Sequence, residues 1–165
     1  MKRSDEDGFV EFVQASSPSL LRTAWLLTGN RHAAEELVQE SLTRLYPKWH
    51  KVQHQQPLAY TRRILVNLHT STWRKYHRES LSYTGDLPEG EPVDATGGSD
   101  NRDHVLRLLR ELPPRERQVI VLRHYADLSE RDVADMLGIS IGTVKSAASH
   151  GLATLRAAHA GKETS

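Results

Sequence analysis

The chain has 165 residues and no cysteine, and its 22 Lys and Arg against 21 Asp and Glu give a formal net charge of +1. This length allows one ordinary domain or two small ones, and the lack of cysteine excludes disulfides and thiolate metal sites. No window approaches the apolar run that a membrane span needs, and the charged segment 1–7 is no secretory signal. A cytoplasmic protein without membrane insertion is therefore expected.

The N-terminal part of the chain is predicted to form four helices. Apolar residues at helical spacing predict helices over 5–14, 18–27 and 32–46, and Pro57 fits the first position of a fourth, which runs to about residue 78. The inner side of the third helix is predicted to consist of Ala34, Val38, Ser41, Leu42 and Leu45. Its outer side groups two carboxylates with two polar side chains, Glu36, Gln39, Glu40 and Thr43. Such a face is either solvated or a docking surface for a basic protein partner.

The fourth predicted helix lies in a segment, residues 41–78, that contains no acid. Its core side is predicted to consist of Leu58, Thr61, Ile64, Leu65, Leu68 and Thr72. The opposite side mixes cations with groups able to touch bases, namely Arg63, Asn67, Thr70, Arg74 and His77, with Trp73 and Arg78 at the margins. This mixture is typical of nucleic-acid contacts, although an aromatic such as Tyr76 fits a core equally well. The preceding polar loop, 48–56, contains Trp49 and has a composition that can hold an unstacked base.

The sign of the charge reverses over residues 79–103, where seven acids face one Arg among many Gly, Pro and Ser residues. Such a composition cannot bury a core and predicts a flexible linker. We place this linker at 81–101, between a domain at 1–80 and a second domain at 102–165.

Two helices around a tight turn are predicted over about 129–157, which is a helix-turn-helix. Ser129 is predicted to cap the first helix and Ser140 the second, with Gly138 at the turn. The apolar stripes are Val133, Met136 and Leu137 on the first helix and Ile141, Val144, Ala148, Leu152 and Leu155 on the second. Short donors face outward between two cations, in the set Thr143, Lys145, Ser146, Ser149, His150 and Arg156. This pattern favours a helix in the DNA major groove, although a surface helix of any small helical domain also fits.

Together these motifs resemble the extracytoplasmic-function sigma factors of the sigma-70 family, in particular the actinobacterial sigma-E-like subgroup. AAEELVQESLTRLY at 33–46 is similar to the family's polymerase-binding helix, and PLAYTRRILVNLHTSTWRKYHRE at 57–79 to the helix that opens and reads the −10 element. The run LPPRERQVIVLRHY followed by a helix-turn-helix with GTVKS, within 108–156, is similar to the −35-binding domain. The resemblance implies an all-α fold of two small helical domains, sigma region 2 and sigma region 4, joined by an acidic linker.

The resemblance also implies three sets of site residues. The set for core RNA polymerase is Glu36, Leu37, Gln39, Glu40 and Thr43. The set for the −10 element is Trp49, Arg62, Arg63, Asn67, Thr70, Trp73, Arg74, Lys75, His77 and Arg78. The set for the −35 element is Thr143, Lys145, Ser146, Ser149, His150 and Arg156. The linker acids Asp86, Glu89, Glu91 and Asp94 are implied to mimic RNA in the exit channel, whereas a plain tether is the simpler interpretation.

The chain departs from the family pattern at two places. Thr70–Thr72 stand where many relatives have an Asp before an Arg-rich run, and Ala147, Ser149 and His150 stand where an Arg or an aromatic is common. The promoter sequence that relatives recognise therefore cannot be transferred to this chain.

The expected function is promoter-specific transcription initiation in a bacterial cytoplasm, at the nucleoid, without catalysis, cofactor or small-molecule substrate. The expected partners are core RNA polymerase and promoter DNA, with an anti-sigma factor as a further candidate. A stand-alone helix-turn-helix regulator is the alternative. His50 and His54 have HxxxH spacing, but no third ligand follows at motif distance, so no metal is expected there.

Overall fold

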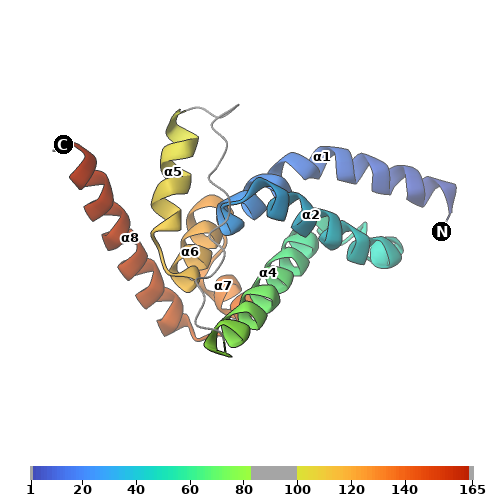
Figure 1. The fold of residues 1–165 in the computed structure, drawn as a ribbon. Coiled ribbons are helices and arrows are strands. Elements are labelled where there is room, and N and C mark those ends of the chain that lie inside the picture. The colour runs from blue at the N-terminus through green and yellow to red at the C-terminus, as the bar shows by residue number, and fades with distance from the viewer. Residues whose placement is uncertain (1, 83–99, 164–165) are drawn as a thin grey trace. The chain divides into compact units, whose positions relative to one another are not determined.

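The structure is a computed structural model that describes residues 2–82 and 100–163, and every regular element within these ranges is helical (Figure 1). The chain divides into two compact units, Met1–Gly90 and Glu91–Ser165. The predicted all-α class with two small helical domains is confirmed. The division between the units falls inside the predicted linker, most of which, with all four of its singled-out acids, lies outside the described residues.

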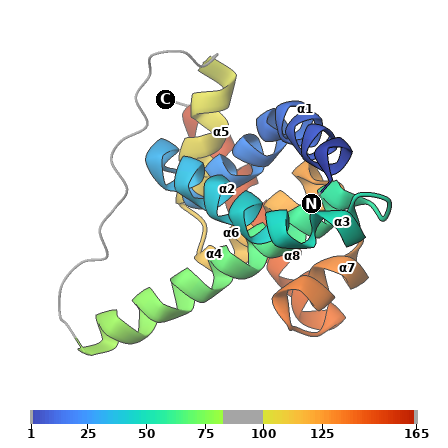
Figure 2. The same cartoon turned by 90° about the vertical axis from the view of Figure 1, so that its right-hand side faces the viewer.

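The first unit consists of α1 (Arg3–Thr28), α2 (Arg31–Leu45), the short turn η1 (Tyr46–Lys48), α3 (Trp49–Val52) and α4 (Pro57–Ser82). Helix α2 packs against both α1 and α4, and α1 also contacts α4. The apolar core between these helices includes Leu20, Ala24, Leu27, Ala34, Val38, Leu45, Leu65 and Val66. Figure 2 shows that the second half of α4 continues beyond α2. Pro57 opens α4, as predicted.

Helix α1 is one continuous helix, so the prediction of separate helices over 5–14 and 18–27 is wrong. Pro18 lies inside it and removes the amide donor that would normally reach the carbonyl of Gln14. Both residues are exposed, so water can satisfy that carbonyl, while the Ser17 hydroxyl donates to the carbonyl of Val13. A buried stripe on both sides of the proline, from Ser16 to Leu27, holds the helix together against α2.

The segment 48–56 is also more ordered than the predicted loop, because it forms the end of η1 and helix α3. Trp49 is only 4% exposed and packs with Leu45 and Val52. Its ring centroid lies 5.5 Å from that of Phe9 and 5.2 Å from that of Phe12, both on α1. The expectation that Trp49 offers an open platform for an unstacked base is therefore wrong, since α1 covers the ring.

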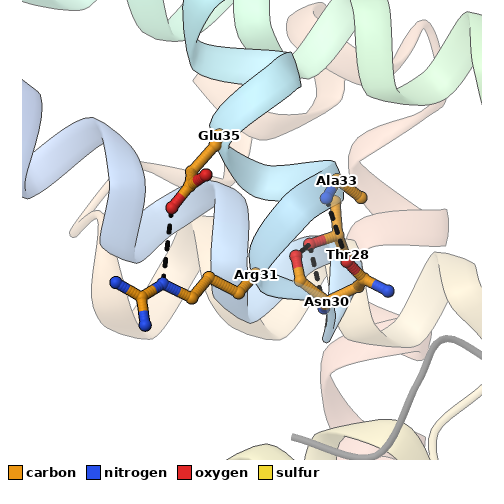
Figure 3. Close-up of polar contacts among 5 residues, drawn as sticks. All are labelled: Thr28, Asn30, Arg31, Ala33 and Glu35. Carbon is orange, nitrogen blue, oxygen red and sulfur yellow. Dashed lines mark hydrogen bonds and ion pairs between the residues drawn. The ribbon is translucent and has the colours of Figure 1, made fainter. Parts of the chain in front are cut away.

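Residues between α1 and α2 fix where α2 begins. Gly29 ends α1 with a left-handed backbone (φ 67°), which glycine adopts without strain. Asn30 then caps α2, because its side-chain oxygen accepts from the backbone N–H of Ala33 at 2.9 Å (Figure 3). The backbone N–H of Asn30 donates to Thr28 Oγ1 at 3.3 Å, and Arg31 pairs with Glu35 at 3.3 Å on the first turns of α2. The start of α2, and hence the register of its outer face, is thus set locally.

The second unit consists of α5 (Asp100–Arg110), α6 (Pro114–Ile120), a π-helical turn η2 (Val121–Tyr125), α7 (Glu130–Leu137) and α8 (Ile141–Glu163). Helix α8 packs against α5, α6 and α7. The core of this second unit includes Leu106, Leu109, Leu112, Val119, Ile120, Val121, Leu122, Val133, Ala134, Leu137 and Val144.

Arg117 joins α5 to α6. Its Nε donates to the carbonyl of Leu109 at 2.9 Å, and one terminal nitrogen donates to the carbonyl of Arg110 at 3.1 Å. These carbonyls belong to the last turn of α5, where acceptors have no donor within the helix. Burial, and secondarily the charge of Arg110, lowers the pKa of Arg117. The guanidinium therefore acts as a C-cap supplied by the next helix.

Candidate polymerase and nucleic-acid interfaces

The outer face of α2 has the composition that the sequence predicts. Its four polar residues line one shallow, open depression: Glu36, Gln39, Glu40 and Thr43. All four are exposed, and Leu37 at the margin is half-buried. The inner face is buried as predicted, with Leu42 half-buried. We name this set of four residues the α2 face.

Both carboxylates of the α2 face have partners on their own helix. Glu36 lies 3.0 Å from His32 Nε2, and Glu40 lies 3.0 Å from Arg44 Nε. The side chains of Glu36 and Glu40 remain 68% and 53% exposed, and pairs this exposed contribute about 0.3–0.5 kcal/mol in helices. A cation on a docking partner can therefore replace either internal partner at small cost.

Helix α4 presents fewer of its predicted base-contacting residues than expected. Arg63, Asn67 and Lys75 are exposed. Arg62 is half-buried and donates to Ser19 Oγ at 3.1 Å, which ties it to α1. The side chains of Trp73, Arg74, His77 and Arg78, and that of Tyr76, lie outside the described residues, so their placement stays a prediction.

Thr70 does not belong to the exposed face of α4. It is 6% exposed, and its hydroxyl donates to the carbonyl of Val66 at 2.8 Å. The projection also placed Thr72 in the core, but this residue is exposed, whereas Val66 is fully buried. The buried stripe is thus rotated toward Val66 and Thr70, because packing on α2 and α1, not the apolar count alone, sets which side of α4 faces inward.

The helix-turn-helix of the second unit is confirmed at both predicted capping residues and at the predicted turn glycine. Ser129 Oγ accepts from the N–H of Asp132 at 3.1 Å, and Ser140 Oγ accepts from the N–H of Thr143 at 3.1 Å. Gly138 between them has φ 65°, a left-handed conformation that ends α7. Two short capping residues and one glycine therefore set the angle between α7 and α8.

The outer side of α8 exposes all six residues of the predicted −35 set: Thr143, Lys145, Ser146, Ser149, His150 and Arg156. Lys145 lies 3.9 Å from Glu130 of α7 and keeps 64% of its side chain exposed, so it is free to move toward an anion. No acidic side chain of α8 occurs before Glu163. We name these six residues the α8 face.

The inner side of α8 differs from the predicted stripe at its first position and at two positions in its middle. Ile141 is 41% exposed, because it stands at the first position of the helix, ahead of the contact with α7. Ala147, which the comparison with relatives put on the outer side, is 8% exposed, and Gly151 is buried. A Cβ added at Gly151 would lie 3.0 Å from Ile120 Cγ1, so α6 approaches the α8 backbone there. Alanine and glycine are only weakly apolar, so helical spacing alone does not reveal this stripe.

Within the ranges 2–82 and 100–163, the structure shows no metal centre built from three or more protein ligands and no membrane span. His50 and His54 are both exposed, and no three side chains of His, Asp or Glu gather around a common point there. No helix of these ranges has the length and apolar content to cross a bilayer.

Comparisons with known proteins agree with this two-part arrangement. The family model described as sigma-70 region 2 matches residues 12–79, and that described as sigma-70, region 4 matches residues 102–155. The chain is 37% identical to an RNA polymerase sigma-E factor of Streptomyces coelicolor over 149 residues, which cover 90% of this chain and 84% of that protein. It is 26% identical to the extracytoplasmic-function sigma factor SigW of Bacillus subtilis, over 94% and 91% of the two chains.

A solved structure agrees as well. The chain resembles the sigma factor RpoE of Bartonella quintana, crystallised with the anti-sigma factor NepR, with a TM-score of 0.73, 28% identity, and coverage of 90% of this chain and 94% of that one. The chain therefore belongs to the extracytoplasmic-function sigma factors of the sigma-70 family.

Proposed function

We propose that this sigma factor uses three surfaces to direct core RNA polymerase to promoters. The α2 face binds core polymerase, the exposed side of α4 contacts the −10 element, and the α8 face contacts the −35 element. The observation that supports the proposal most directly is the exposure of all six α8-face residues on a capped helix-turn-helix. None of the three surfaces performs covalent chemistry, so the proposed function is binding and DNA opening without catalysis.

The residues of the α8 face differ in whether they suit contacts to phosphates or to base edges. Long cations reach phosphate oxygens, which position a protein on DNA without reading sequence, and Lys145 and Arg156 fit that role. Ser146, Ser149 and His150 are shorter donors and acceptors that reach base edges in the major groove. The first turn also exposes the aliphatic Ile141, and an apolar group there suits the methyl group of a thymine.

The exposed side of α4 is suited to a strand that is being opened. Arg63 and Lys75 provide cations for phosphates, and Asn67 provides an amide that pairs with a base edge. Extracting a base from the duplex costs a few kcal/mol, which stacking on a planar side chain offsets by about 1–3 kcal/mol per base. With Trp49 buried, we assign that stacking role to Trp73.

The proposed location of the protein in the cell follows from its proposed partners. Core polymerase and promoter DNA place the protein in the bacterial cytoplasm, at the nucleoid during initiation. The Bartonella quintana relative is bound to an anti-sigma factor, and we propose a protein partner of that class for this chain as well.

Run-off transcription tests the function against the alternative of a stand-alone DNA-binding regulator. Core polymerase, this protein and a library of linear promoter templates are the only macromolecules in the assay. We expect transcripts from a subset of templates that share a −35 and a −10 motif, with permanganate-reactive thymines near the −10 element. A protein that binds DNA but yields no transcript and no open bubble would fit the stand-alone regulator.

A second experiment assigns the sequence preference at −35 to His150. His150→Ala should relax the choice at one or two adjacent base pairs, because a single imidazole contact discriminates at the low end of about 1–3 kcal/mol per base pair. His150→Arg should favour guanine there, since the forked guanidinium pairs with two guanine acceptors. The readout is the motif selected from the promoter library.

Lys145→Ala is the matched comparison within the same helix. Loss of one phosphate contact should weaken binding to every sequence alike and reduce the slope of log affinity against log salt by about one unit. If both His150 variants select the parental −35 motif, the α8 face does not read bases through this residue.

A further inference from the structure

Two histidines from helices far apart in sequence meet on the second unit. His104 lies on α5 and His159 on α8, two helices that pack together (Figure 1). The distance from His104 Nε2 to His159 Nδ1 is 3.3 Å, and the ring centroids are 5.6 Å apart with 56° between the ring planes. In this contact one nitrogen donates and the other accepts, depending on the tautomer. One of these two nitrogens therefore carries a proton and the other a lone pair, and both offer a lone pair at once only when each ring has its proton on its other nitrogen.

The spacing of these two nitrogens matches that of two ligands on one metal ion. Zinc–imidazole bonds are about 2.0–2.1 Å long, so two imidazoles at a tetrahedral angle have their nitrogens about 3.3–3.4 Å apart. The nitrogens of His104 and His159 already have this separation. An ion beside the line that joins them could bond to both once the rings rotate and the proton between them moves to the other nitrogen of its ring.

Exposure and ligand type define which ions fit. His104 is half-buried and His159 is exposed, so a hydrated ion can reach the pair from solvent. No third His, Asp or Glu completes a cluster among the described residues, so water would fill the other positions. Imidazole suits Cu²⁺, Ni²⁺ and Zn²⁺, whereas Mg²⁺ and Ca²⁺ prefer oxygen ligands.

We propose that His104 and His159 form an exchangeable binding site for a divalent transition-metal ion of the zinc and copper type. The bound ion cross-links α5 to the C-terminal half of α8. Because α8 is one continuous helix, the site braces the same helix that contains the α8 face. The proposal does not depend on the assignment of the DNA contacts.

Thermal unfolding of the full chain without an affinity tag tests the site. Zn²⁺ at roughly ten times its dissociation constant should raise the Tm of the second unit by about 6–11 °C, and Mg²⁺ at the same concentration should leave it unchanged. Cu²⁺ should act at lower concentrations than Zn²⁺. In ¹⁵N spectra, Zn²⁺ should shift the ring nitrogens of His104 and His159 before those of the other histidines.

The variants separate this site from general metal binding by a chain that contains nine histidines. His159→Gln and His104→Gln should each lose the Zn²⁺-dependent rise in Tm, and their Tm without metal shows whether they fold. His124→Gln, which changes an exposed histidine of the same unit, should keep the rise. No rise in the parent chain, or an equal rise in His159→Gln, means an adventitious ion only and overturns the proposal.

Discussion

Reversing both carboxylates of the α2 face, Glu36→Lys with Glu40→Lys, should weaken binding to core RNA polymerase by at least about 100-fold. The two residues are exposed on one face of a helix whose start is fixed by the Asn30 cap. Like charges brought together at an interface cost several kcal/mol, and each 1.4 kcal/mol is a factor of ten in affinity. The fold should survive, because the internal pairs with His32 and Arg44 are exposed and contribute little.

Competition against the unmodified sigma factor for a limiting amount of core polymerase measures this effect, and circular dichroism checks the helix content. Glu35→Lys is the matched control, since Glu35 is an exposed acid of the same helix with an exposed partner, Arg31, at 3.3 Å. It lies beside the α2 face but does not line the depression. Equal losses in the control and the double variant would point to net charge, and unchanged affinity of the double variant would remove α2 from the interface.

Local chemistry explains why parts of the fold were predictable from the sequence. The predicted caps Ser129 and Ser140 and the left-handed Gly138 act within four residues of the sequence. The faces of α2 were predicted well because aliphatic residues recur there at helical spacing, with charged residues opposite. The sequence alone predicts a helix end or a buried face when the residues that determine it lie within one short segment.

The errors occur where burial and helix continuity depend on three-dimensional surroundings that the apolar spacing does not show. Trp49 is in the core because Phe9 and Phe12, about forty positions earlier, cover its ring. Thr70 is buried although it is polar, because its hydroxyl is satisfied by the carbonyl one turn earlier. Helix α1 continues through Pro18 because the carbonyl of Gln14, which loses its usual donor there, lies on an exposed stretch where water can donate to it. None of these outcomes follows from spacing alone.

The same reasoning predicts that Gly151 of the second unit does not tolerate a larger side chain. Ile120 Cγ1 and Cδ1 would lie 3.0 and 3.3 Å from a Cβ at this position, and Glu116 Cβ would lie 3.6 Å away. Gly151→Leu adds three further carbons at this contact between α6 and α8, and overpacking of this kind costs about 1–3 kcal/mol. Leucine has a better helix propensity than glycine, but this offsets only about 0.8 kcal/mol of that cost.

Gly161→Leu is the matched control, because it makes the same change in the same helix where no described atom lies within 4 Å of the added Cβ. It should stabilise the unit slightly through helix propensity, so the difference between the two variants isolates the packing cost. Hydrogen exchange of the backbone amides of Val119 and Val144 measures the stability of this unit separately from the first.

The Gly151→Leu substitution should also weaken the proposed contacts of α8 with DNA. Helix α8 holds Gly151 one residue after His150, so moving its backbone away from α6 displaces the outer side of the same helix. We expect Gly151→Leu to weaken binding to a −35 duplex while Gly161→Leu preserves it, at a temperature where both variants remain folded. If the two variants show equal exchange rates and equal DNA affinity, the close approach of α6 to Gly151 does not position the recognition helix.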